Sequence, residues 1–537
     1  MSEAINQPSA ALHAHDIDLK KSTLASFLPS ILAVGGAVLL TLLRLRVGGE
    51  SFISDGALMM LALAAYLTAA VFTLTNLYAP STLFQKLGLW AATAGVFFNL
   101  ASWGVRWIAA YDRELAIIAR QGGEMPWVWR YIPFANLYDL SLAFAFGAGI
   151  TTLLIAHRPS FRFLGAISLP LAALILVLAR FIGGEFINLP PVLDSYWRPI
   201  HVGIASLSYG IALVCFAVAV IYLLKDGVKT EAMAIWSSVF ALAVFATISR
   251  FSVFAPSTFG TYSASVFIPT TSSKMALPLR ADIPYVGWLL VLSALLLVGV
   301  CVAFMRYLAR HDETARIWGH RLLKASLVVQ AAAIAALVGQ IKTIVDVASR
   351  IDARQFGDFG SYLAKQQGLT AEQIAQLPAG RLTTASADFV RERGGELFLS
   401  LQANPVELAA LITAFAGTLF VIIFSFRTER LRETLPPLEK IDSLMYKTAG
   451  VAFAGLALLL MTGAIWANES WGRYWGWDSK ETGAFVAWLT YAGFLHTRIS
   501  RGWTGRASAY FAIVAFLLVI FTYLGVSYLL PGLHSYA

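Results

Sequence analysis

The chain carries little charge for its length. Of its 537 residues, 13% are Asp, Glu, Lys or Arg and 58% are hydrophobic, whereas soluble domains carry roughly a quarter charged residues. The apolar residues gather in blocks of roughly 20, the length that crosses a bilayer as a helix. The low charge therefore excludes an ordinary water-soluble protein.

Cysteine is also scarce, with only Cys215 and Cys301, and both fall inside apolar blocks. A disulfide framework and a Cys-x-x-Cys pair are therefore excluded. The sequence also lacks Cys-x-x-Cys-His, the motif for covalent haem attachment, so we expect no haem bound covalently to this chain. Residues 1–23 are polar and lead directly into the first apolar block, so we expect no cleavable signal peptide.

The apolar blocks predict an all-α polytopic membrane protein with about thirteen transmembrane helices. These spans lie near 24–46, 56–78, 86–106, 137–157, 161–182, 199–224, 232–253, 285–308, 322–346, 405–426, 445–466, 482–498 and 507–529. Boundaries read from hydropathy are good to a few residues.

The net charge of +9 comes mainly from Lys and Arg in every second short loop. This pattern predicts a multi-pass protein of the bacterial inner membrane, with a cytoplasmic amino terminus and an external carboxyl terminus. The lipid bilayer, and not nucleic acid, is therefore the expected surrounding of these charges.

The chain divides into four expected parts. Residues 1–23 form a cytoplasmic tail, 24–224 an amino-terminal transmembrane bundle, 225–436 an insertion with extra spans, and 437–537 a carboxyl-terminal core. Within the insertion, the polar external loop 347–404 contains a helix-like stretch at 369–376. We expect that loop to form a small subdomain or a lid.

The external loop between the spans 445–466 and 482–498 is unusually aromatic. It holds Trp466, Trp471, Tyr474, Trp475, Trp477, Asp478, Lys480 and Glu481. Trp and Tyr offer wide contact area at low entropic cost, and the glycines between them permit close backbone approach. The loop is either an amphipathic hairpin in the headgroups or a platform for a large flat ligand, whose carboxylates Arg473 or Lys480 could meet.

Three histidines are candidates for metal ligation. The predicted topology puts His201 and His534 on the external face with the aromatic loop. Neutral imidazole is a common metal ligand, and two imidazoles suit six-coordinate haem iron. Alone, each would be an interfacial histidine, and the shared side favours ligation. His496, near the cytoplasmic end of span 482–498, either has a function inside the membrane or snorkels toward the headgroups.

These motifs resemble a known family. Trp466–Glu469, Trp471-Gly472, Tyr474-Trp475 and Trp477–Thr482 resemble the WWD signature of bacterial and chloroplast cytochrome c assembly proteins. Leu495–Arg498, Gly532–Tyr536 and Tyr196–Val202 are similar to motifs of the CcsA type, also called ResC. The resemblance covers about 86–224 and 437–537 and departs at Asp139-Leu140, where the family usually has Glu-Ser.

The resemblance implies a haem-handling site. His201 and His534 would be the external axial ligands of haem b, and His496 a transmembrane ligand for haem on its way out. The haem-binding platform would comprise Trp471, Tyr474, Trp475, Trp477, Asp478 and Glu481. On this reading the two carboxylates brace the loop, and no residue acts as a catalytic acid or base.

The resemblance also implies an activity and partners. The chain would be a subunit of a system II cytochrome c synthase, a haem lyase that forms thioether bonds. Its partners would be a CcsB- or ResB-type membrane protein, an apocytochrome c with a CxxCH motif, and external thiol-reducing proteins. Two alternatives stay open: a CcmC- or CcmF-like haem-handling protein, and a membrane transporter of another apolar solute.

Overall fold

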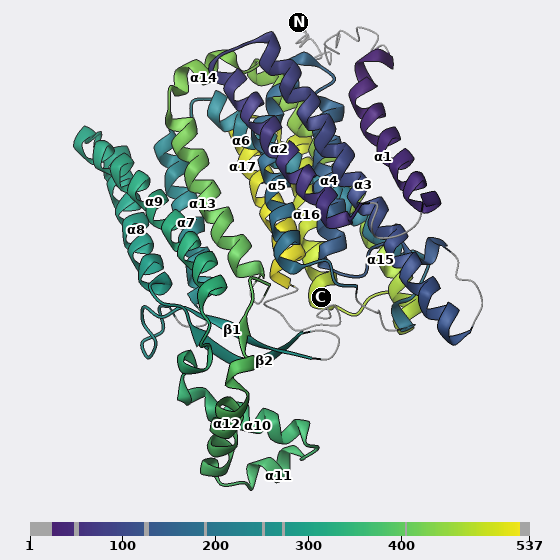
Figure 1. Ribbon diagram of the computed structural model, residues 1–537. Helices are drawn as coiled ribbons and strands as arrows, with labels where there is room; N and C mark the ends of the chain where they lie inside the picture. Colours follow the sequence, from purple (N-terminus) through teal and green to yellow (C-terminus); the bar gives the residue numbers. More distant parts are fainter. Residues whose placement is uncertain are drawn as a thin grey trace, which may run out of the picture.

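The computed structural model describes residues 24–47, 53–122, 128–186, 191–249, 253–270, 274–402 and 405–526. Long helices lie side by side in the body of the molecule, and a small subdomain with α10, α11 and α12 extends from the lower end (Figure 1). His534 falls outside the described residues, so its predicted role rests on the sequence.

The amino-terminal part is a set of six long helices. They are α1 (Leu28–Val47), α2 (Asp55–Tyr78), α3 (Thr82–Gln121), α4 (Leu137–Ile155), α5 (Gly165–Ile182) and α6 (Trp197–Lys225). Polar caps fix several starts: the side chains of Ser54, Ser81 and Asn136 accept hydrogen bonds from backbone amides in the first turns of α2, α3 and α4, as N-cap residues do. Helix α3 continues through 107–121, where the sequence predicted an external loop.

The middle part combines helices with a small sheet. Its elements are α7 (Thr230–Ser249), β1 (Ser263–Pro269), β2 (Lys274–Asp282), α8 (Val286–Arg310), α9 (Glu313–Thr343), α10 (Phe356–Gln366), α11 (Ala371–Ala375), α12 (Ala379–Arg393), β3 (Phe398–Leu399), α13 (Pro405–Ser425) and α14 (Thr428–Thr434). The sheet is antiparallel in the order β2-β1-β3. The sequence did not predict these strands, whereas the helix-like stretch at 369–376 corresponds to α11.

The carboxyl-terminal part consists of α15 (Leu438–Trp471), α16 (Ser479–Arg501) and α17 (Arg506–Ile520). A π-helix at Phe521–Gly525 follows α17 directly. Single π-turns are rare and frequently lie at functional sites.

The all-α polytopic prediction is confirmed. Within the described residues, ten helices are long and apolar enough to cross a membrane. Each predicted span overlaps a helix, but α3 and α16 are not among the ten, and α7 supplies only the shorter apolar helix Thr230–Ala246. The count of thirteen spans therefore stays a prediction.

Two large groups of buried apolar residues hold the helices together. The first joins α2 to α6 with α15, α16 and α17, and includes Phe144 and Tyr523. The second joins α7, α8, α9 and α13 with the sheet, and includes Leu290 and Val266. The second group lies within the predicted insertion 225–436, whose exact boundaries stay a prediction.

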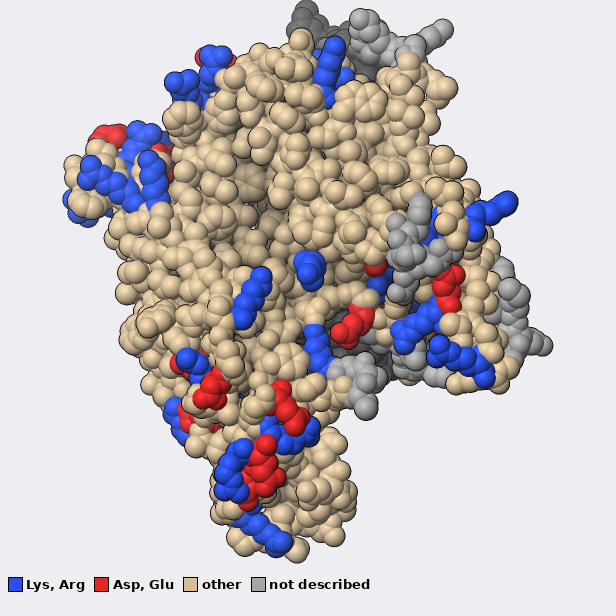
Figure 2. All heavy atoms as spheres, viewed as in Figure 1, with Lys and Arg blue, Asp and Glu red and all other residues tan. Residues whose placement is uncertain are grey.

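The outer surface has the character of a lipid-facing one. Figure 2 shows a broad band with almost no charged side chains across the molecule, and most Lys, Arg, Asp and Glu lie toward its ends. Large apolar side chains within helices are strongly exposed, among them Trp236 at 71%, Leu39 at 67% and Leu295 at 65%. Exposed apolar surface of this extent marks a membrane contact, so the chain is a multi-pass membrane protein.

Candidate functional site

A cavity lies where α4 and α6 begin and α15 ends. Its empty volume is about 1330 Å³, a value that includes the open mouth. Its walls come from five parts of the chain: the segment Phe134–Leu137, α6, α15 with the aromatic loop, the first turns of α16, and Tyr523 of the π-helix. By the predicted orientation this is the external end of the bundle.

His201 lies in the first turns of α6 and lines this cavity. Its Nδ1 lies 3.0 Å from the backbone oxygen of Leu459 on α15. A carbonyl oxygen can only accept, so Nδ1 carries the hydrogen and Nε2 carries the lone pair that a metal ion takes. A second-shell carbonyl that fixes the tautomer in this way is common at metal-ligating histidines.

Gly463 and Trp466 of α15 lie against the same imidazole. A Cβ added at Gly463 would lie 2.7 Å from Cε1 of His201, closer than any side chain tolerates. The ring centroids of His201 and Trp466 are 5.7 Å apart. The missing side chain therefore lets the imidazole lie directly on α15, beside an indole that also lines the cavity.

The shape of the aromatic loop is fixed by its backbone conformation and by hydrogen bonds to its backbone amides. Helix α15 ends at Trp471, and Gly472 caps it with a positive φ of 71°. Trp477 also has a positive φ, 56°, which is uncommon for a bulky residue. Carboxylate oxygen Oε2 of Glu481 accepts hydrogen bonds from the amides of Gly476 at 2.8 Å and Asp478 at 3.2 Å.

The two carboxylates also start α16. Asp478 is its N-cap, and together with Glu481 it forms a capping box, in which each side chain satisfies a backbone amide of the other end. Through these hydrogen bonds, the Asp478 and Glu481 side chains stabilise the loop. They leave the loop's aromatic rings on the surface: Trp477 is 69% exposed and Tyr474 62% exposed.

The cavity collects part of the predicted set. Of the predicted residues, it is lined by His201, Trp471, Tyr474, Trp475 and Glu481. Trp477 and Asp478 belong to the same loop but are not part of the lining; the Trp477 ring makes an edge contact with the Trp475 ring, with centroids 5.8 Å apart. His534 lies outside the described residues.

His496 lies far from the cavity. It is exposed on α16, fifteen residues after Glu481, which is roughly 22 Å along a helix at about 1.5 Å per residue. Most of the length of α16 thus separates His496 from the cavity that His201 lines, so the two histidines cannot ligate one iron. An exposed histidine on a helix flank can face lipid or another subunit.

Three buried polar atoms near the cavity lack protein partners. Among the described residues, no hydrogen-bond partner exists for the indole Nε1 of Trp466, the hydroxyl of Ser470 and the indole Nε1 of Trp475. All three residues line the cavity. An unsatisfied buried donor costs about 1–3 kcal/mol, so these donors favour a ligand with acceptor groups.

Two cationic side chains also favour a ligand with acceptor groups. Lys480 and Arg198 both line the cavity, and Arg198 is only 8% exposed. Lys480 lies just before the predicted span 482–498; burial lowers the pKa of its ammonium to about 8, and Asp478 opposes this shift. The lining residues therefore fit, by their chemistry, a flat ligand with a metal centre and acidic groups, such as haem.

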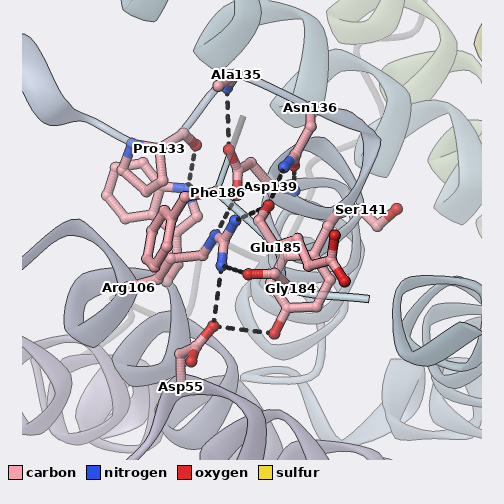
Figure 3. A network of polar contacts seen from close by, with 12 residues as sticks. Asp55, Arg106, Pro133, Ala135, Asn136, Asp139, Ser141, Gly184, Glu185 and Phe186 are labelled. Atoms are coloured by element: carbon pink, nitrogen blue, oxygen red, sulfur yellow. Dashed lines mark hydrogen bonds and ion pairs between the residues drawn. The ribbon is translucent and has the colours of Figure 1, made fainter. Parts of the chain in front are cut away.

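A buried polar network supports one wall of the cavity (Figure 3). Arg106 of α3 is 1% exposed and pairs with Asp139 of α4 and Asp55 of α2. The other oxygen of Asp139 accepts from the amide of Ala135 at 2.9 Å. Ala135 lines the cavity, so the network fixes the segment before α4. Sequence reasoning noted Asp139 only as a departure from the family; Arg106 and Asp139, opposite charges at the ends of two spans, could have indicated the pair.

Tyr523 of the π-helix was also missed. Its ring lines the cavity, and its hydroxyl lies 2.6 Å from that of Ser141 on α4. No periodicity in the sequence indicates a π-turn, because the extra residue only shifts the register of the residues after it. The π-helix therefore places a tyrosine in the cavity just before the segment that carries His534.

The fold and this cavity define a multi-pass membrane protein with an aromatic, histidine-containing site at one end of its bundle. The sequence model of the family described as "Cytochrome C assembly protein" matches residues 134–281 and 405–534. The match covers more than half of the chain, and the chain belongs to this family. The matched segments contain His201, the aromatic loop and His496, and they leave 282–404 uncovered.

Individual relatives agree with this assignment. The chain is 40% identical over 176 residues to the cytochrome c biogenesis protein CcsA of Prochlorococcus marinus (strain MIT 9515), which covers 33% of this chain and 53% of the relative. It is 52% identical over 98 residues to the CcsA protein of Synechococcus sp. (strain CC9902), covering 18% of this chain and 32% of the relative. The chain thus spans about half the length of the first relative and about a third of the second.

Proposed function

We propose that this chain binds haem at the external face of the membrane and presents it for covalent attachment to apocytochrome c, as the CcsA-type subunit of a cytochrome c synthase. The observation that carries the proposal is the cavity that joins His201 with Trp471, Tyr474 and Trp475. Family membership and the names of the relatives support a role in cytochrome c biogenesis.

Haem b is the substrate that the site would hold. Nε2 of His201 takes one axial position of the iron, and His534 takes the other by resemblance. Trp471, Tyr474, Trp475 and Trp477 contact the flat macrocycle, while Asp478 and Glu481 hold the loop that carries them. The indole donors and Lys480 meet the haem carboxylates, which are acceptors.

The reaction needs positioning more than acid–base chemistry. Each cysteine thiol of the apocytochrome adds across one haem vinyl group: an S–H bond and a C=C π bond are lost, and a C–S bond and a C–H bond form. No electrons are exchanged with an outside donor in this addition. Holding both reactants in one site is worth several kcal/mol, roughly 7–11 in the best cases.

The remaining parts of the proposal concern delivery and partners. His496 is one of two transmembrane haem ligands, and a CcsB- or ResB-type subunit supplies the other. Its exposure on the flank of α16 supports a role at a contact with another subunit. External thiol-reducing proteins keep the CxxCH cysteines reduced. We further propose that the chain lies in the bacterial inner membrane, with the aromatic loop on the external side.

An absorption spectrum tests the proposal most directly. The full-length chain, purified from membranes with its CcsB-type partner under haem-replete expression, should show a Soret band and a b-type pyridine haemochrome. A folded but colourless preparation would contradict the proposal and favour a transporter of another apolar solute. A haem-loaded preparation that does not support thioether formation would favour a CcmC- or CcmF-like carrier.

A further inference from the structure

A chain of aromatic contacts leads from the aromatic loop down into the bundle. The ring of Phe485 on α16 lies 6.2 Å from that of Trp475 and 6.4 Å from that of Trp477, as centroid distances. Phe485 in turn lies 5.9 Å from Trp488. Trp488 stacks on Phe453 of α15 at 5.5 Å and an interplanar angle of 17°. Aromatic rings are therefore continuous from the loop to the middle of α15 and α16.

The same flank of α16 continues to His496. Phe485 and His496 are eleven residues apart, about three turns or roughly 16 Å, so they lie on nearly the same side of the helix. Ala492 occupies the position between them, and its small side chain leaves room. On α15, a Cβ at Gly450 would meet nothing within 4 Å. Small residues thus lie between the ring stack and His496.

The facing surfaces of α15 and α16 between the aromatic loop and His496 form a strip. A charged pair lies at the end of this strip away from the loop. Arg498 of α16 pairs with Asp442 of α15, and its guanidinium lies 4.9 Å above the ring of Tyr446. Tyr446 lies seven residues, about two turns, before Phe453, on the same side of α15. The strip between α15 and α16 therefore runs from Tyr446 and His496 to the aromatic loop.

Trp488 has a feature that packing alone does not require. Its indole Nε1 is buried and has no hydrogen-bond partner among the described residues. A buried Trp usually finds a partner for this group, and a Phe at this position would stack without an unsatisfied donor. The donor gains a partner when a molecule with acceptor groups lies on the stack.

We propose that haem travels from His496 to the aromatic loop along the strip between α15 and α16, with the Phe453–Trp488 stack as the intermediate station. This inference rests on the proposed function, and it adds Phe453, Phe485 and Trp488 as positioning residues for transfer. The flat macrocycle lies against the stacked rings, and the indole donor of Trp488 meets a haem carboxylate. From the stack to the loop the strip presents aromatic rings in contact with one another, and between His496 and the stack it presents small residues.

The intermediate station is tested by measuring the haem content of Trp488→Leu alone and in combination with His496→Ala or His201→Ala. In Trp488→Leu, haem should accumulate at His496: the content that depends on His496 persists, and the content that depends on His201 falls about fivefold. Combining Trp488→Leu with His496→Ala should therefore remove nearly all haem, whereas combining it with His201→Ala should change little. Maturation of a c-type cytochrome should fall about fivefold, in line with the loss of an aromatic stack.

Three further variants separate transfer from packing. Phe453→Leu should reproduce the effect of Trp488→Leu, and Trp488→Phe, which keeps the stack but removes the indole donor, should give an intermediate loss of transfer. Phe494→Leu removes a similar ring from the opposite side of α16, where Phe494 is 1% exposed and packs on Phe511, and it should leave the distribution of haem unchanged. The assay uses the full-length chain purified from membranes.

The outcomes distinguish this inference from the proposed function. Full His201-dependent haem in Trp488→Leu would overturn the station and leave the proposed function intact. Equal losses in Phe494→Leu and Trp488→Leu would show that the rings only support packing. A wild-type chain that binds no haem at all would instead overturn the proposed function, and the transfer route with it.

Discussion

The position of His201 depends on a residue without a side chain. Because Gly463 has no Cβ, the imidazole lies against α15 and its Nδ1 reaches the oxygen of Leu459. The contact fixes one edge of the imidazole ring, and His201 lines the cavity. A histidine held in this way is pre-organised for one axial position.

We predict that His201→Gly and His534→Gly each abolish maturation of c-type cytochromes, because each removes one axial ligand of the haem iron. Added imidazole should partly restore maturation by occupying the vacated position. The measurement is the amount of covalent haem in a reporter cytochrome, with and without imidazole. If neither folded, haem-loaded variant responds to imidazole, both residues are ordinary interfacial histidines.

Under the proposed function, we predict that Lys480 makes haem retention depend on pH. Burial lowers the pKa of its ammonium to about 8, so the cation that attracts haem carboxylates is present below that pH and is lost above it. A bound carboxylate stabilises the ammonium and raises the pKa, so retention should weaken at or above pH 8. The loss should be about tenfold, the worth of a charged hydrogen bond.

The control for this prediction is Lys480→Gln, which keeps the length of the side chain and removes its charge. This variant should hold haem weakly across the whole pH range, and its dissociation rate should be flat where that of the wild type rises. Parallel pH profiles for the two proteins would assign the titration to another group. Haem transfer to apomyoglobin, followed by absorbance, supplies the rates.

At the scale of elements, the helices followed from the sequence and the sheet did not. Blocks of about 20 apolar residues predict spans, and each predicted span overlaps a helix. β1, β2 and β3 hold nine residues or fewer each; β1 and β2 form a hairpin, whereas β1 pairs with β3 across more than a hundred residues. Short strands with distant partners leave little pattern in a single sequence.

Part of the candidate site was likewise predictable from the sequence, and part was not. The aromatic loop was predictable because its tryptophans are adjacent in sequence and unusual in number. Lys480 was recognised there for the same reason. Arg106, Gly463 and Tyr523 come together with it only through packing between α3, α4, α6, α15 and the π-helix. No local pattern marks Gly463 or Tyr523, so only the fold assigns them a place; for Arg106, the opposite charge of Asp139 at the end of the next predicted span was the available signal.

At the scale of the whole molecule, the proposed function requires haem to pass between two distant places. His496 lies on the flank of α16 toward the predicted cytoplasmic side, and the aromatic loop lies at the other end. Loss of an early ligand should empty the later site, because haem cannot reach it. Loss of the platform should weaken retention without closing the route.

We therefore predict that His496→Ala lowers the haem content of the purified protein sharply, by roughly tenfold if ligation supplies most of the entry affinity. Trp475→Ala combined with Trp477→Ala should leave haem bound, but loosely held and poorly transferred to apocytochrome. Haem per protein, the rate of haem loss and the yield of covalent cytochrome distinguish the two variants. Trp503→Ala, at an exposed indole beyond the end of α16, serves as the control for removing a surface ring. If His496→Ala kept full haem and full activity, His496 would be a snorkelling histidine, and delivery through the membrane would have to use other residues.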